Sequence, residues 1–131
     1  MSLRPAVFLL LLIAVTATAG PSERVTGSNS RMCDSDGKVC LQGSITYYSN
    51  PRLLELRSRV QRASGPGLIV FRLTGENRDG HLRRTSIEVR IRGRYSEIVS
   101  TRLITDHPDV VSWTLESIQF TPGDPPDSNN R

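Results

Sequence analysis

The chain has 131 residues, of which 37% are hydrophobic, 23% are charged and 5% are aromatic, and its formal net charge is +4. This length allows one small domain and excludes a large multidomain enzyme or a multi-span membrane protein. The composition is that of an ordinary globular protein and excludes a collagen-like chain, and two cysteines are too few for a disulfide-dense mini-protein.

Residues 1–19 are typical of a secretory signal peptide. Arg4 supplies the positive start, and residues 6–15 form an apolar run that is too short for an ordinary membrane span. Ala17-Thr18-Ala19 then offers the small residues that a signal peptidase accepts. An uncleaved anchor is the alternative. We therefore expect a secreted protein without a membrane span.

One β-rich domain is predicted over residues 32–121. Residues 20–31 are small and polar and predict a flexible N-terminal arm, and residues 122–131 predict a disordered tail. Cys33 and Cys40 flank a tight-turn pair, Asp36-Gly37, and export favours a disulfide between them. A zinc site is the poorer alternative, because no histidine lies nearby.

A short strand and a helix are expected next. Residues 44–49 are rich in β-branched and aromatic side chains, which favour a strand. Asn50-Pro51 then has the form of a helix start, with asparagine as the cap and proline in the first turn. Apolar residues follow at spacings of three and four, so the sequence predicts an amphipathic helix over 51–63. Its apolar stripe is Leu53, Leu56, Val60 and Ala63.

From residue 68 the apolar period changes to two, which is typical of strands with one wet face. Four strands are predicted, over residues 68–74, 85–92, 95–105 and 111–120. A shift of phase near Ser117 predicts a bulge. The fold class is therefore mainly β, as a small antiparallel sandwich or a sheet with one short amphipathic helix. The core has few aromatic residues, so completion by a partner or by a second copy, as a homodimer, is also expected.

Part of this pattern resembles a known family. Val70-Phe-Arg-Leu-Thr-Gly75, a turn that ends in Gly80, and the alternating strand from Thr85 to Gly93 resemble the opening of a PLAT domain. That domain is the β-sandwich at the C-terminus of pancreatic-type lipases and the N-terminus of lipoxygenases. Residues 100–115 are similar to a later piece of it. The resemblance covers 68–121 and implies a non-catalytic module that docks on a lipid surface, a protein or a heparin-like glycan.

The sequence offers few residues that could form a catalytic or metal-binding site. His81 and His107 are the only histidines, and no G-x-S-x-G nucleophile elbow occurs. Residues 34–37 resemble the start of a calcium loop but lack its later ligands. The acidic loop 106–109 is better explained as a solvated turn. We therefore expect no enzyme, no metal and no cofactor.

Arginine is the best candidate for function. The chain has 16 arginines and a single lysine, and a guanidinium group binds sulfate, phosphate or carboxylate through two parallel hydrogen bonds. Arg90 and Arg92 are expected on one strand face about 6–7 Å apart, a spacing that suits neighbouring anions on a polymer. Glu88 shares this face and weakens its field. The predicted binding residues are Arg83, Arg84, Arg90, Arg92 and Arg94.

These observations predict a secreted, non-enzymatic binding module. Its partner would be an anionic glycan, a lipid surface or a secreted protein. Nucleic acid is not expected, because no aromatic platform accompanies the arginines. The alternative is a secreted effector of toxin, salivary or defence type that acts on a receptor or an enzyme. Salt separates the two, since binding to an anionic polymer weakens steeply as salt rises.

Overall fold

A computed structural model of the protein describes residues 22–123. Strands make up 70% of these residues, no helix occurs among them, and all strand pairs are antiparallel. The expected fold class, mainly β and antiparallel, is confirmed. The predicted signal peptide, 1–19, and residues 124–131 of the predicted tail lie outside the described residues. No segment of residues 22–123 forms a helix long and apolar enough to cross a membrane.

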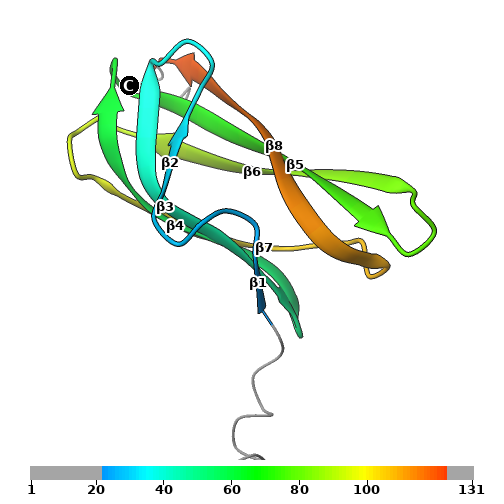
Figure 1. Cartoon of the computed structure of the whole chain (residues 1–131). Coiled ribbons are helices and arrows are strands. Elements are labelled where there is room, and N and C mark those ends of the chain that lie inside the picture. Colours follow the sequence, from blue (N-terminus) through cyan, green and yellow to red (C-terminus); the bar gives the residue numbers. More distant parts are fainter. Residues whose placement is uncertain (1–21, 124–131) are drawn as a thin grey trace, which may run out of the picture.

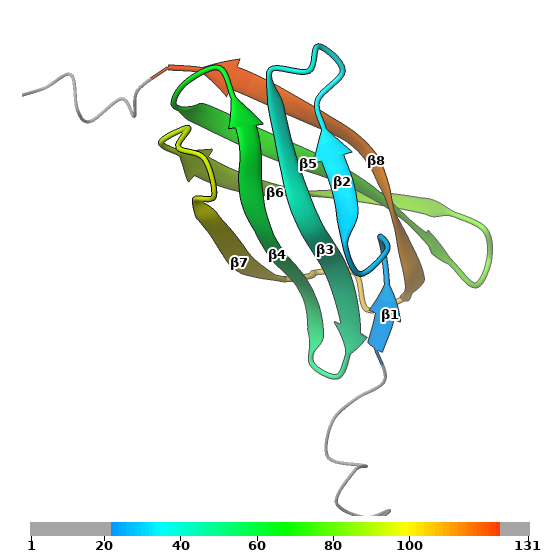
Figure 2. The same cartoon turned by 60° about the vertical axis from the view of Figure 1, so that its left-hand side comes forward.

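In residues 22–123, eight strands form two sheets that face each other (Figure 1). The five-stranded sheet contains β1 (Ser22–Arg24), β2 (Ser30–Cys33), β3 (Val39–Ser49), β4 (Arg52–Ala63) and β7 (Ile98–Ile104). The three-stranded sheet has β5 (Gly67–Asn77) in the middle, between β6 (Leu82–Ile91) and β8 (Val110–Pro122). In Figure 2, β1 and β2 follow one another along one edge of β3, and β7 lies at the opposite edge of the sheet, beyond β4.

The core lies between the two sheets. Each strand turns every second side chain inward, so both sheets bury one apolar face against the other. Tyr47 of β3 and Trp113 of β8 meet edge to face across the sandwich, with ring centroids 6.5 Å apart. The largest fully buried side chains are Phe71, Leu41, Ile45, Leu54, Leu56, Ile69, Leu73, Val39 and Val60.

The predicted helix over 51–63 is wrong, because this stretch forms β4. From Leu56 to Gln61 the side chains of β4 alternate between buried and exposed, which is the period of a strand. The buried set is Leu54, Leu56, Ser58 and Val60, and the exposed set between and after them is Arg57, Arg59 and Gln61. β4 is a central strand that pairs with β3 on one side and β7 on the other. These two ladders outweigh the local helix signal, since sheet preference depends on tertiary neighbours.

The other predicted strands occur, with shifted ends. β3 begins at Val39, earlier than the expected start at residue 44, and β5, β6, β7 and β8 match the four later predictions. The predicted bulge near Ser117 is also confirmed. Arg72 pairs with Ser117 and Leu73 pairs with Leu115, so Glu116 is the extra residue.

The expected flexible arm over 20–31 is corrected by the structure, because residues 22–31 contain β1 and the start of β2. The backbone N–H groups of Val25 and Thr26 donate to the carbonyl of Ile45, at 2.9 and 3.3 Å. The Thr26 hydroxyl accepts from the Ile45 N–H at 3.0 Å. Sequence composition missed these strands because they are short and depend on β3 as a template.

The predicted disulfide between Cys33 and Cys40 is confirmed. The two cysteines lie directly opposite each other at the ends of β2 and β3. In the turn between them, the Asp34 carboxylate accepts a hydrogen bond from the Val39 N–H at 3.0 Å, and its carbonyl accepts one from Gly37 at 3.2 Å. The bond therefore fastens the short β2 to the long central β3.

Candidate functional site

The five arginines of the predicted binding site do not share one surface. Arg84 and Arg90 lie on the outer face of the three-stranded sheet, but six residues apart on β6, which is roughly 20 Å along a strand. Arg83 has the opposite orientation, because neighbouring residues of a strand alternate between faces. Arg92 and Arg94 follow β6 in its loop to β7. Two of the five residues are therefore brought to one face, and none are neighbours there.

The outer face of the three-stranded sheet is also electrically balanced. Among the outward residues of its strands, three arginines stand against three glutamates. These are Arg72, Arg84 and Arg90 against Glu76, Glu88 and Glu116. Arg72 donates to Gln119 at 2.7 Å, and the Thr74 hydroxyl donates to Glu116 at 3.1 Å. This face therefore has no net charge to attract an anion.

The outer face of the five-stranded sheet is strongly positive. The register places five arginines and one glutamate, Glu55, among its outward residues, which gives a net charge of +4. All five arginines are exposed. We call them the basic face: Arg24, Arg31, Arg57, Arg59 and Arg102. A single-sign surface of this kind attracts anions over a distance set by the salt concentration.

Glu55 lies under the basic face and positions two of its arginines. It is buried, and its carboxylate accepts hydrogen bonds from Arg102 Nε at 3.1 Å and from the Tyr48 hydroxyl at 3.4 Å. Arg57 Nε is 3.9 Å from Glu55 Oε2, the carboxylate oxygen to which Arg102 donates. The arginine side chains are 73% and 69% exposed, whereas that of Glu55 is 10% exposed. Glu55 thus holds each guanidinium by Nε and leaves the outer N–H groups to water or a ligand.

A shallow hollow of about 630 Å³ opens beside Arg57 and Arg59. Arg59 donates to the backbone oxygen and hydroxyl of Ser96, at 3.5 and 3.3 Å, on the far side of the hollow. Tyr95 and Ile98 also line it, and they are 82% and 67% exposed. Guanidinium groups next to an exposed ring suit a sugar that carries an anionic group, since the ring packs on apolar sugar faces.

The loop that presents Tyr95 is held by Glu97. Its carboxylate accepts hydrogen bonds from the backbone N–H groups of Arg92, Gly93 and Arg94, at 3.0 to 3.2 Å. The Ser96 N–H donates to the Val60 carbonyl at 2.7 Å and ties the loop to β4. Arg92 and Arg94 therefore contribute their backbone to the loop that forms one wall of the hollow.

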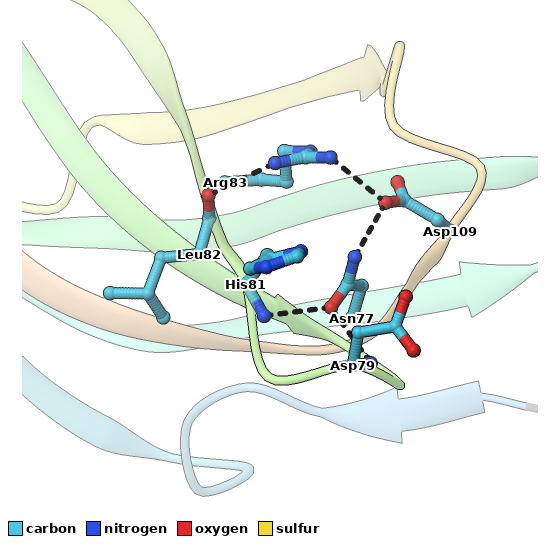
Figure 3. A network of polar contacts seen from close by, with 6 residues as sticks. All are labelled: Asn77, Asp79, His81, Leu82, Arg83 and Asp109. Carbon is cyan, nitrogen blue, oxygen red and sulfur yellow. Dashed lines mark hydrogen bonds and ion pairs between the residues drawn. The ribbon is translucent and has the colours of Figure 1, made fainter.

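A second polar cluster lies at the end of the sandwich where β5 turns into β6 (Figure 3). Asn77 is buried, and its side-chain oxygen accepts from the backbone N–H groups of Asp79 and His81, at 3.0 and 2.8 Å. Its side-chain nitrogen donates to Asp109 at 3.0 Å, and Arg83 pairs with the same carboxylate oxygen at 3.3 Å. Each member has a partner, so this cluster fastens two loops.

Asp109 is expected to make stability depend on pH in acid. The hydrogen bond from Asn77, supported by the positive charge of Arg83, holds the pKa of the Asp109 carboxyl below its ordinary value of 3.8. A carboxyl with a lowered pKa in the folded state stabilises above its ordinary pKa, and this contribution is lost as the pH falls through the lower value. Asp109→Asn should therefore be less stable than the wild type at pH 7 and equally stable in strong acid. Urea unfolding across that pH range measures the gap, and a gap that stays constant would contradict the assignment.

Metal-ligating side chains do not converge in residues 22–123. The described residues contain no group of three histidine, cysteine or acidic side chains that could hold a metal ion. His107 of the acidic loop lies against Trp113 instead, with ring centroids 6.1 Å apart.

Sequence reasoning missed the basic face because it placed Arg57 and Arg59 within a predicted helix over 51–63. The signal was present in the strict alternation from Leu54 to Val60, in which Glu55, Arg57 and Arg59 occupy every second place. No protein-family model, curated protein or solved structure matches this chain. The resemblance to a PLAT domain stays a prediction.

Proposed function

We propose that the protein is a secreted, non-enzymatic binding module that holds a sulfated glycan on its basic face. The observation that carries the proposal is the contrast between the two outer faces, one with a net charge of +4 and the other with none. The disulfide supports secretion, because such bonds persist in oxidising compartments. The leader-like residues 1–19 support it as well.

The spacing of the arginines fits a polymer with regular anionic groups. Arg57 and Arg59 are successive outward residues of β4, about 6–7 Å apart. Arg57 is paired with Ser100, so Arg102 lies diagonally across from it on β7, about 7–8 Å away. A chain laid across β4 and β7 would meet these three guanidinium groups and reach Tyr95 at the rim of the hollow.

Removing two arginines from the basic face should weaken glycan binding by about tenfold to a hundredfold, given roughly 1.5–3 kcal/mol for a hydrogen bond to a charged group and screening in salt. The variant is Arg57→Ser, Arg59→Ser, and its matched control is Arg84→Ser, Arg90→Ser on the balanced face. Both lose two positive charges from exposed strand positions. The measurement is the salt concentration at which each elutes from heparin, followed by titration with a heparin fragment.

The outcomes separate the classes of partner. Early elution of the first variant alone supports the basic face. Equal shifts of both variants would mean that only net charge counts, which contradicts a defined site. If the wild type passes through heparin at low salt but binds vesicles with anionic lipid headgroups, the glycan is the wrong ligand. Failure to bind either would favour an effector that acts on a protein.

A further inference from the structure

β7 is an edge strand of the five-stranded sheet, and no strand of the described part of the chain pairs with its outer edge. Within residues 22–123, its only ladder partner is β4 (Figure 2). The register with β4 runs from Ile98 to Ile104 without interruption. An edge strand presents a row of free N–H and C=O groups, which is a template for another strand.

The pattern of apolar and polar residues in β7 is symmetric about the middle of the strand. Ile98-Val99 and Leu103-Ile104 are the apolar ends, and the three polar residues between them are centred on Thr101. If two copies pair antiparallel about Thr101, Ile98 falls opposite Ile104 of the second copy and Val99 falls opposite its Leu103. Ile98 and Ile104 are 67% and 65% exposed in the single chain, and this pairing would cover both. The strand is therefore complementary to itself.

The hydrogen-bonding groups point the right way for this register. The Thr105 N–H donates to the Arg52 carbonyl at 3.0 Å, so Thr105 faces β4. Alternation along an antiparallel strand then turns the N–H and C=O of the even-numbered residues, Ile98 through Ile104, to the free edge. Pairing about Thr101 sets even-numbered residues of one copy opposite even-numbered residues of the other. Their free N–H and C=O groups can therefore bond to each other.

Charge also agrees with this pairing. Arg102 is the one charged residue of β7, and it falls opposite the uncharged Ser100 of the second copy. A shift of the register by one residue would set each residue with free backbone groups opposite one whose groups already bond to β4. A shift by two residues would no longer place Ile98 opposite Ile104 of the second copy. No other register of β7 on itself satisfies both conditions.

The remaining long edges carry the features that discourage pairing. β8 is interrupted by register irregularities at Glu116 and Val111, and β6 bears the charges of Arg84, Glu88 and Arg90. β7 has neither an irregularity in its ladder nor a proline. With Arg102 as its single charge, β7 is the least protected of these three edges.

We propose that two copies of the chain associate through β7, pairing antiparallel about Thr101 so that their five-stranded sheets join into one continuous sheet. The partner is a second copy because the apolar ends, the charge and the direction of the free backbone groups are all met by β7 itself. The proposal does not rest on glycan binding, although Ile98 also lines the hollow beside Arg57, because its test reads mass rather than ligand affinity.

Analytical ultracentrifugation over a series of protein concentrations tests the contact. The wild type should approach twice the chain mass as the concentration rises. Ile98→Lys, Ile104→Lys places like charges opposite each other at both ends and should remain monomeric. Ile98→Glu, Ile104→Lys removes the same apolar surface but places opposite charges together, and it should dimerise. Both positions are exposed, so far-ultraviolet circular dichroism should be unchanged.

A cross-link fixes the register. Thr101→Cys should form a disulfide between copies, because non-hydrogen-bonded partners across an antiparallel ladder have Cα atoms about 4.5 Å apart, within disulfide range. Ile104→Cys is the control, since two copies of residue 104 would be roughly 20 Å apart. A monomeric wild type at every concentration, equal masses for the two charge variants, or cross-linking of the control would each overturn the proposal.

Discussion

Gly43→Ala is expected to lower the free energy of unfolding by more than about 4 kcal/mol, the range reserved for severe changes in a core or a backbone. Gly43 lies in the middle of β3, opposite Ser58 of β4. A Cβ atom there would fall on the backbone oxygen of Arg57 and within 2.6 Å of Ser58 Cα. These atoms belong to the neighbouring backbone, so no side-chain rotation can make room, and the two central strands must separate.

A large part of the stability of a small domain would be lost by this change, since such domains unfold at a cost of only about 5–15 kcal/mol. Circular dichroism and urea unfolding measure it. Gly37→Ala is the matched control. Gly37 has a φ of 72° in the turn between the cysteines, with nothing within 4 Å of its added Cβ, so only the left-handed backbone cost of about 1–2 kcal/mol applies. Similar losses for both variants would refute the close approach at Gly43.

Phe71→Ala is expected to lower the free energy of unfolding by about 3–5 kcal/mol, because it removes a large buried ring and leaves a cavity. Phe71 is fully buried and lies on β5, the central strand of the three-stranded sheet. Its partners Ile87 on β6 and Ile118 on β8 are held by the same backbone ladders, which limits how far the site can collapse.

Urea unfolding also measures this change. Leu82→Ala is the control, because it truncates an apolar side chain that is 54% exposed at the start of β6, where a loss within about 0.5 kcal/mol is expected. A loss below about 1 kcal/mol for Phe71→Ala would mean that the Phe71 ring is not buried between the two sheets.

The sequence could predict those strands in which apolar and polar residues alternate and no apolar residues recur at helical spacing. In 85–92 the apolar residues occupy only every second place, and the result is β6. β4 is different, because Leu53, Leu56 and Val60 match helical spacing while Leu54, Leu56 and Val60 match a strand. Local pattern cannot decide between them. Pairing with β3 and β7 decides it, and those contacts are distant along the chain.

The candidate site could be predicted only in part, for the same reason. Arg90 was expected on the wet face of a strand and lies on one, but Arg92, expected beside it, falls in the loop after β6, and glutamates of β5 and β8 join Glu88 on the face that carries Arg90. The basic face depends on four strands brought together by the sheet order, and on a β4 that local reasoning took for a helix. The charge of a face is a property of the topology, so the sequence pattern of one strand could not reveal it.

The far edge of the five-stranded sheet sets how large an assembly could grow. There β1 and β2, each of four residues or fewer, follow one another along β3, and the disulfide fixes β2 in place. A third chain would find no long straight strand to extend. The five-stranded sheet thus has one edge, β7, that can pair with another chain and one edge, β1 and β2, that cannot be extended. Pairing of two β7 edges gives a dimer and does not continue into a filament.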